Sequence, residues 1–381
     1  MVQRAFSDVP IPSGLDANVV WDSGGMVPTS HQREQHAPEN RNDNSVREPP
    51  ARALLASVVR LSHVIHGVRT RVAGASGFTP TIVAYPGYGS TTWVRVLARV
   101  VLTSKPAAAS GTVRGWHAFT SVPVPRSEVA VEIGGVIHPV RADDGGLVDE
   151  VLQISLAPGW HPVVLRSPET APAEAQVLVV APDATFGIVS DIDDTVMVTA
   201  LPRPLLAFWN TLVVSERART PTPGMAVLLD RIVARHPETP VLYLSTGPWN
   251  VAPALARFLA RNLYPKGVLL LTDWGPTLQR WFRSGREHKQ NNLERLAREF
   301  PGVRWLLLGD DGQHDPEIYA DFARAHAGQT AAIAIRQLSA GEALLAGGRA
   351  HEDATEHGSV PWVTAPDGAG MAAQLGSYGL L

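Results

Sequence analysis

The first feature that could do chemistry is a cluster of carboxylates at the end of an apolar, β-prone run. Residues 186–190 form the run, and Asp191, Asp193, Asp194 and Thr195 follow it closely. Carboxylates repel one another and resist burial, so such a cluster needs a compensating charge. A hard cation such as Mg²⁺ would supply that charge through oxygen ligands and leave room for a phosphate. Because a carboxylate can also act as a nucleophile, the segment predicts metal-assisted phosphoryl transfer.

Other sites built from similar residues fit less well. An EF-hand loop needs Gly at its sixth position and Glu at its twelfth, where this chain has Val196 and Pro202. The Gly-x-x-x-x-Gly-Lys-Ser/Thr motif of a nucleotide-binding P-loop does not occur in the sequence. A solvated acidic turn remains an alternative if this segment is considered alone.

Three later segments carry further polar groups beside apolar runs or helical patterns. Ser245 follows the β-prone run 240–244, and Asp310 and Asp315 follow the run 305–308. A hydroxyl and free amides at a strand-to-helix turn can bind phosphate oxygens. Each group also has an ordinary explanation, since Ser245 could cap a helix and the aspartates could flank a Gly turn.

Lys289 lies in a different context, near the start of a helical pattern that opens at Glu287. Apolar residues continue this pattern at Leu293, Leu296 and Phe300. A lysine here could be a solvated residue at a helix start. Considered alone, Lys289 fits that explanation better than the alternative, in which it supplies positive charge to a phosphoryl group.

The elements that must position these groups alternate along the chain. Helices are predicted at about 251–262 and 316–326, and strands at 267–272 and 331–336. Strands that alternate with helices predict an α/β fold with a parallel sheet covered on both faces. The carboxyl ends of such strands lie at one edge, so Asp191, Asp193, Ser245 and Asp310 can converge there. The four signals are the segment of Asp191 and Asp193, Ser245, Lys289, and Asp310 with Asp315. Their occurrence in this order favours one phosphoryl-transfer site over four unrelated features.

These residues resemble the four motifs of the haloacid dehalogenase superfamily of phosphatases. The motifs are Asp191-x-Asp193-x-Thr195, Ser245, Lys289, and Gly309-Asp310 with Asp315. The longer strings at 191–196 and 309–319 are similar to the actin-patch-associated phosphatidate phosphatase family and its bacterial relatives. This likeness extends from about residue 85 to the C-terminus, with the most specific motifs between 186 and 319. Gly247 and Asp311 stand where that family leads us to expect Ser.

The resemblance and the chemistry imply the same catalytic roles. Asp191 would attack phosphorus, and Asp193 would protonate the leaving alkoxide and then deprotonate the hydrolytic water. Ser245 and Lys289 would bind the phosphoryl oxygens. Thr195 is expected to support the loop after the first strand.

The same resemblance implies a Mg²⁺ site. Its ligands would be the Asp191 carboxylate, the Asp193 backbone carbonyl, Asp310 and Asp315. The extra carboxylate at Asp311 leaves open whether Asp311 or Asp315 completes the metal shell. A non-catalytic metal-binding domain would not need both Asp193 and Lys289.

Two short inserts bear on the substrate. Residues 197–223 and 273–288 are too short for a large cap, which favours a large substrate such as a lipid headgroup. Aromatic and basic residues in the second insert suit an anionic membrane interface, although a solvated basic rim is an equal alternative. We therefore expect phosphatidate or a related lipid phosphate as the substrate. The alternatives are a soluble phosphomonoesterase acting on a sugar phosphate or nucleotide, and a peripheral membrane-binding protein whose phosphatase site is secondary.

The domain organisation can be predicted from composition and periodicity. Residues 1–50 are expected to be disordered, and residues 51–75 to hold an amphipathic helix that docks on the protein or binds membrane. Residues 76–182 predict a small antiparallel β-sandwich without catalytic groups of its own. Residues 183–381 form the expected haloacid dehalogenase-like, Rossmann-like parallel-sheet phosphatase domain, with a helix near 370–375.

Composition limits the remaining function classes. The 33 basic and 36 acidic residues give a net charge of −3, which does not favour nucleic-acid binding. The chain has no cysteine, so disulfides and thiolate metal ligands are excluded. The sequence contains neither a signal-peptide core nor an apolar run of about 20 residues. We therefore expect a cytoplasmic protein whose membrane contact, if any, is peripheral.

Overall fold

Two large β-sheets organise the part of the chain that the structure describes. The structure is a computed structural model that describes residues 78–103, 122–168, 170–198, 220–272, 278–312, 314–346 and 359–381. The first sheet comes from residues 79–179, and the second from residues 186–365. The acidic motifs predicted from the sequence lie at the ends of strands of the second sheet or in the segments that follow them.

The second sheet has six strands, and every neighbouring pair is parallel. Its order is β13 (Val268–Thr272), β12 (Val241–Pro248), β9 (Phe186–Asp191), β14 (Arg304–Asp310), β15 (Thr330–Arg336) and β16 (Trp362–Ala365). The central strands are buried on both faces, which explains their continuous apolar sequences. Because parallel strands end at the same edge, the residues that follow β9, β12 and β14 meet there.

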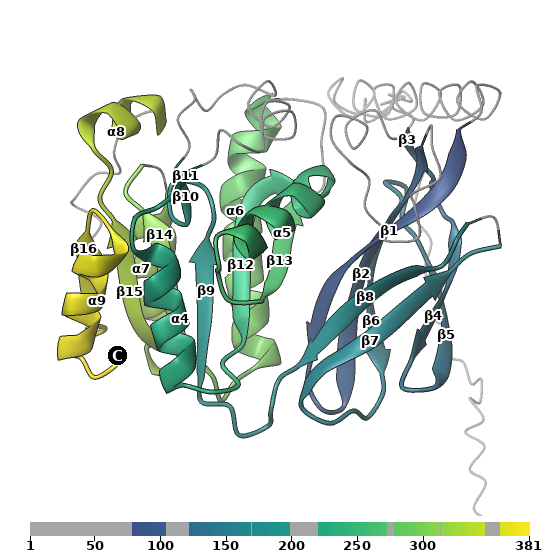
Figure 1. Cartoon of the computed structure of the whole chain (residues 1–381), viewed down its shortest axis with the longest axis horizontal. Helices are drawn as coiled ribbons and strands as arrows, with labels where there is room; N and C mark the ends of the chain where they lie inside the picture. The colour runs from purple at the N-terminus through teal and green to yellow at the C-terminus, as the bar shows by residue number, and fades with distance from the viewer. Residues whose placement is uncertain are drawn as a thin grey trace, which may run out of the picture. The chain divides into compact units, whose positions relative to one another are not determined.

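Helices connect these strands and cover the sheet (Figure 1). They are α4 (Met225–Arg235), α5 (Ala252–Arg261), α6 (Leu278–Glu299), α7 (Asp315–Ala325), α8 (Ala340–Ala346) and α9 (Gly368–Ser377). Helix α6 packs against α7 and β12, whereas α4 packs against α9. Helix α4 buries Met225, Leu228, Leu229 and Ile232, the spacing of one helical face.

A short hairpin follows the acidic motif of β9. Strand β10 (Met197–Val198) pairs antiparallel with β11 (Thr220–Pro221). The intervening part of the first predicted insert, residues 199–219, lies outside the described residues.

The first sheet consists of eight connected strands among the described residues. They are β1 (Thr79–Gly89), β2 (Trp93–Thr103), β3 (Val122–Pro123), β4 (Glu128–Ile133), β5 (Val136–Arg141), β6 (Leu147–Gln153), β7 (Gly159–Arg166) and β8 (Ala173–Val179). Their order is β3-β2-β1-β8-β7-β4-β5, with β6 paired to β2. Every pair is antiparallel except β1 with β8, and an apolar core that includes Val131, Val163 and Leu165 stabilises the sheet.

The predicted mixed α/β class is confirmed. The strands predicted at 267–272 and 331–336 correspond to β13 and β15, and the predicted helix near 370–375 lies within α9. The β-sandwich description and the domain boundaries stay predictions. The expected disordered segment and amphipathic helix lie outside the described residues.

One helix start was predicted incorrectly. The helical pattern was expected to open at Glu287, but α6 already begins at Leu278. Aromatic and basic residues occupy its first turns, so this part lacks the apolar periodicity from which a buried helix is recognised. Much of the second predicted insert is therefore part of α6.

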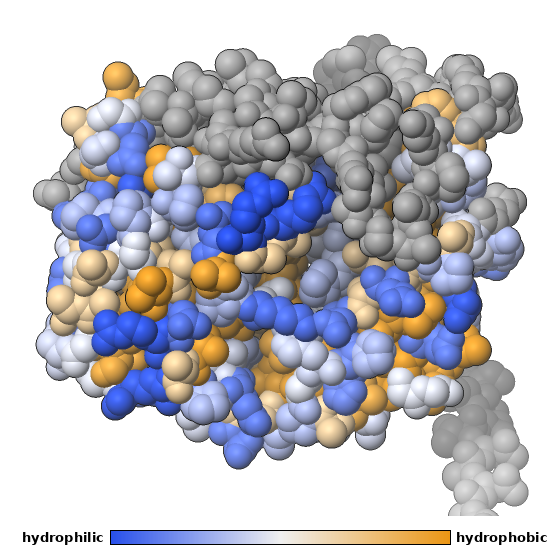
Figure 2. Space-filling model, in the orientation of Figure 1, coloured by the Kyte–Doolittle hydropathy of each residue, from blue (hydrophilic) through white to orange (hydrophobic). Residues whose placement is uncertain are grey.

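Membrane contact remains a prediction. Among the described residues, no helix is both long enough and apolar enough to span a bilayer. Hydrophobic and hydrophilic side chains are interspersed over the face drawn in Figure 2. Arg286, one of the basic residues considered for an interface, forms an ion pair of 2.9 Å with Glu317 of α7.

Candidate active site

The carboxyl end of β9 carries the first two candidate residues. Asp191 is the last residue of β9, Asp193 follows after one residue, and both side chains are buried. A tight turn comes next, in which the Val196 amide donates a 3.0 Å hydrogen bond to the Ile192 carbonyl. Asp194 in this turn has a φ of 57°, a left-handed conformation that few non-glycine residues adopt. The turn fixes the backbone directly after Asp193.

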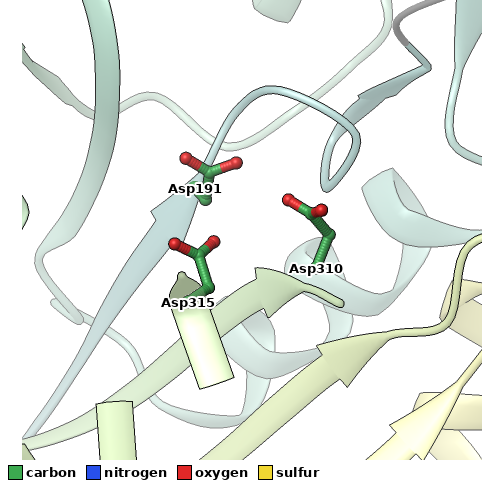
Figure 3. Close-up of side chains that lie close together, drawn as sticks. All are labelled: Asp191, Asp310 and Asp315. Atoms are coloured by element: carbon green, nitrogen blue, oxygen red, sulfur yellow. The ribbon is translucent and has the colours of Figure 1, made fainter. Parts of the chain in front are cut away.

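The carboxyl end of β14 brings two more aspartates to the same place (Figure 3). Asp310 ends β14, and Asp315 is the first residue of α7. One carboxylate oxygen from each of Asp191, Asp310 and Asp315 lies within 4.8 Å of the others. Gly309 permits this approach, because a Cβ at its position would lie 2.6 Å from Asp315 Oδ2. The structure thus brings together three of the four predicted metal-ligand residues by their side chains.

Lys289 reaches this cluster from α6. Its Nζ lies 2.7 Å from Asp191 Oδ1 and 2.5 Å from Asp315 Oδ1. Burial alone would lower the pKa of this ammonium, but Asp191 and Asp315 outweigh burial and raise the pKa above its ordinary value. Lys289 is therefore a buried, charged partner of the carboxylates and not a solvated residue at a helix start.

The cluster fits a divalent cation. Burial raises the pKa of Asp191; Lys289 opposes this effect, while Asp315, Asp310 and Asp193 add to it. One ammonium thus leaves buried negative charge without full compensation. The buried Oδ2 of Asp315 has no hydrogen-bond partner among the described residues. A set of carboxylate oxygens with uncompensated charge suits Mg²⁺.

Ser245, near the end of β12, contacts Asp193. Its hydroxyl donates a 3.0 Å hydrogen bond to Asp193 Oδ2, and the Gly247 amide donates to Ser245 Oγ at 3.0 Å. Thr272 supports the same loop by donating to the Thr246 carbonyl at 2.9 Å. The sequence predicted Ser245 at this edge, although its hydrogen bond to Asp193 could not be foreseen.

Asp311 lies outside the carboxylate cluster that contains its neighbour Asp310. Its Oδ1 accepts a 2.8 Å hydrogen bond from the Leu338 amide, and its own amide donates to the Arg336 carbonyl at 3.0 Å. The cluster of carboxylates contains Asp315 and not Asp311. The geometry therefore favours Asp315 of the two candidates that the sequence left open.

Two supporting residues were missed by the sequence analysis. Arg336 and Tyr264 donate hydrogen bonds to the carbonyls of Asp194 and Val196, at 2.8 Å and 2.6 Å. For Arg336, the sequence offered one signal, namely an arginine directly after the apolar run 331–335. Thr195, the expected support for this loop, is buried, and its hydroxyl has no hydrogen-bond partner among the described residues.

One segment of the chain matches a known protein family. Residues 186–337 match the family model of the catalytic domain of phosphatidate phosphatase APP1. The matched range begins at the first residue of β9 and ends just after β15, so it contains every candidate residue. The predicted family resemblance is confirmed for these residues.

Two curated fungal proteins are similar to part of this chain. Phosphatidate phosphatase APP1 of Saccharomyces cerevisiae is 24% identical over 154 residues, which cover 40% of this chain and 26% of the yeast protein. An uncharacterized protein of Schizosaccharomyces pombe is 27% identical over 155 residues, which cover 40% of this chain and 25% of that protein. The matches thus span about a quarter of the length of these relatives.

Similarity to solved structures is weak. A carbohydrate acetylesterase from Xanthomonas citri aligns with 74% of this chain and 65% of its own, at 14% identity and a TM-score of 0.27. PhoD aligns with 67% of this chain and 70% of its own, at 9% identity and the same TM-score of 0.27. Neither similarity carries an argument about fold or function.

Proposed function

We propose that this protein is a Mg²⁺-dependent phosphatase that hydrolyses a phosphomonoester through an aspartyl-phosphate on Asp191. The observation that carries the proposal is the buried group of Asp191, Asp310, Asp315 and Lys289 within the segment that matches the phosphatidate phosphatase family. We extend the proposal to the fold and assign the parallel-sheet domain to the haloacid dehalogenase type.

The first chemical step would transfer the phosphoryl group to the protein. A carboxylate oxygen of Asp191 forms a bond to phosphorus as the bond from phosphorus to the leaving oxygen breaks. Asp193 gives its proton to that leaving oxygen. The hydrogen bond from Ser245 to Asp193 Oδ2 orients this acid, and it leaves the other oxygen to carry the transferred proton.

The second step would return the phosphoryl group to water. Asp193, now deprotonated, takes a proton from a water molecule whose oxygen forms the new bond to phosphorus. The bond between phosphorus and Asp191 breaks, which regenerates the carboxylate and releases inorganic phosphate. Both steps therefore need Asp193 within hydrogen-bond reach of the reacting oxygen.

The residues that would hold Mg²⁺ are Asp191, Asp310 and Asp315, with the backbone carbonyl of Asp193. When bound, the cation supplies charge neutralisation to the phosphoryl oxygens and allows the anionic substrate to approach. Lys289 would contribute a second positive charge beside Asp191. The cation and Lys289 would thus neutralise the phosphoryl group together, which explains why Lys289 contacts two of the proposed metal ligands.

Phosphatidate or a related lipid phosphate is the substrate we propose. Its support is the family match of residues 186–337, since the geometry of the carboxylates specifies a phosphoryl group and not the alcohol attached to it. Short soluble phosphomonoesters should consequently be poorer substrates than phosphatidate presented in micelles.

The proposal can be tested by measuring phosphate release from phosphatidate in detergent micelles with Mg²⁺. The parent protein would be compared with Asp191→Asn and with Asp311→Asn as the matched control. We expect Mg²⁺-dependent release that disappears in the first variant and persists in the second. Asp191-dependent hydrolysis of an aryl phosphate alone would retain the mechanism and reject the lipid substrate.

A further inference from the structure

The loop that carries Asp193 is held by an arginine from a different strand. Arg336 is the last residue of β15 and only 4% exposed. Its Nη1 donates a 2.8 Å hydrogen bond to the backbone carbonyl of Asp194. We infer that Arg336 is a positioning residue that fixes Asp193 for acid–base chemistry. This inference rests on the proposed function.

The bond to Asp194 acts at a point where the backbone is unusual. Asp194 adopts a φ of 57°, and its amide donates to the Met197 carbonyl at 2.7 Å. A left-handed conformation in a buried aspartate costs free energy and persists only where surrounding contacts hold it. Arg336 supplies such a contact directly after Asp193.

Arg336 is itself fixed by two other segments. Its Nη2 donates to Glu342 Oε1 of α8 at 2.7 Å, and its Nε donates to the Pro366 carbonyl at 3.2 Å. Burial alone would raise the pKa of Glu342, but hydrogen bonds from Arg336 and Ser339 outweigh burial and lower it. Helix α8 and the segment after β16 therefore support the acid–base loop through one side chain.

A second contact restrains the other side of the same loop. The Tyr264 hydroxyl donates a 2.6 Å hydrogen bond to the Val196 carbonyl. With Arg336 on Asp194 and Tyr264 on Val196, two carbonyls in the turn are bonded to side chains from elsewhere in the fold. Acid–base catalysis requires this restraint, since a displacement of about 1 Å can cost about 10²-fold in rate.

The test compares an alkyl phosphate with an aryl phosphate, because their leaving groups need protonation to different extents. An alkoxide needs the proton of Asp193, whereas an aryl oxide leaves readily without it. We expect Arg336→Lys and Arg336→Met to lower kcat/KM, which reports on transfer to Asp191 and not on the later hydrolysis, by roughly 10- to 100-fold for the alkyl ester and by less for the aryl ester. KM should change little, and Asp193→Asn should show the same pattern more strongly.

Controls separate positioning from a general loss of stability. Arg95→Gln also removes a largely buried arginine, one that is paired with Asp149 and Glu299 at 2.6 and 3.1 Å. It should lower stability without changing the ratio of the two rates. If Arg336→Met does not fold, Tyr264→Phe loosens the same turn without removing a charge and should shift the ratio in the same direction.

Equal losses of kcat/KM on both esters would overturn the inference, as would unchanged kcat/KM values in folded Arg336 variants. Full activity in Asp191→Asn would instead reject the proposed function. The two failures are therefore distinguishable.

Discussion

The ends of β9 and β14 share a sequence theme but differ in what their carboxylates contact. Each apolar strand ends in an aspartate, and further aspartates follow within five residues. At β14, Asp310 accepts from the Gly312 amide at 2.8 Å, and Asp311 accepts from the Leu338 amide. At β9, Asp191 faces the ammonium of Lys289, and Asp193 accepts from the Ser245 hydroxyl. Asp315, which begins α7 after β14, shares the contact with Lys289.

The contacts of a carboxylate determine what it can do at the end of a strand. Carboxylates bonded to backbone amides are fixed in place, which suits holding a cation or a loop. Carboxylates that contact charged or hydroxyl side chains keep groups available for bond making and proton transfer. We therefore propose that Asp191 and Asp193 at the end of β9 react, and that Asp310 and Asp311 at the end of β14 give support.

The largest effect is expected at the nucleophile. Asp191→Asn preserves shape but removes the attacking charge, so turnover should fall by about 10⁴-fold or more. The measurement is steady-state phosphate release with Mg²⁺ present. If the variant retained more than a tenth of the parent activity, Asp191 would not be the nucleophile, and the end of β9 would no longer differ in role from the end of β14.

Asp310→Asn should remove most of the stabilisation that Mg²⁺ gives to the folded protein. At a Mg²⁺ concentration of 100 times Kd, binding adds about 2.7 kcal/mol to the free energy of unfolding. Denaturant titrations with Mg²⁺ and with a chelator would show this increment in the parent protein. The variant should lose most of it, and a full increment would argue against Asp310 as a ligand.

Lys289→Gln should reduce activity and stability together. Loss of one charged group at the phosphoryl site costs about 10²- to 10³-fold in turnover. Because Asp191 and Asp315 raise the folded-state pKa of Lys289, its stabilisation is complete below the unfolded pKa of about 10.4 and is lost at higher pH.

The stability difference between the parent and Lys289→Gln should thus be constant from pH 7 to 9 and shrink above about pH 10.4. Urea unfolding at several pH values measures it. A difference that already shrank between pH 7 and 9 would mean that the lysine is neutral in the folded protein.

Asp311→Asn should have the smallest effect. Asparagine keeps an oxygen that can accept from the Leu338 amide, so stability should fall by less than about 1 kcal/mol. Turnover and the Mg²⁺ increment should remain close to those of the parent. If the variant lost the Mg²⁺-dependent gain in the free energy of unfolding, Asp311 would be a metal ligand like Asp310.

The sequence predicted the strand ends because local rules determine them. An apolar run followed by Asp191 or Asp310 marks both the end of a buried strand and the polar edge of a parallel sheet. The proximity of these residues then follows from the alternation of strands and helices. Asp315 was recognised beside Asp310 in the sequence, and its role as a metal ligand was predicted from the family resemblance.

Contacts between distant segments could not be predicted in this way. The bond from Arg336 to the Asp194 carbonyl depends on how β15 lies beside β14, and Asp194 itself is not a glycine that would signal a positive φ. The start of α6 was missed because its first turns lack a regular apolar face. Tertiary contacts, which leave no local periodicity, determine the bond from Arg336.

The most direct test is to search for the phosphorylated protein itself. The parent protein would be mixed with a substrate labelled in its phosphoryl group, quenched in acid within milliseconds, and mapped by peptide mass. We expect a hydroxylamine-sensitive label on Asp191, and none in Asp191→Asn. A label on another residue, or turnover that persists in Asp191→Asn, would contradict the assignment of the nucleophile to the end of β9.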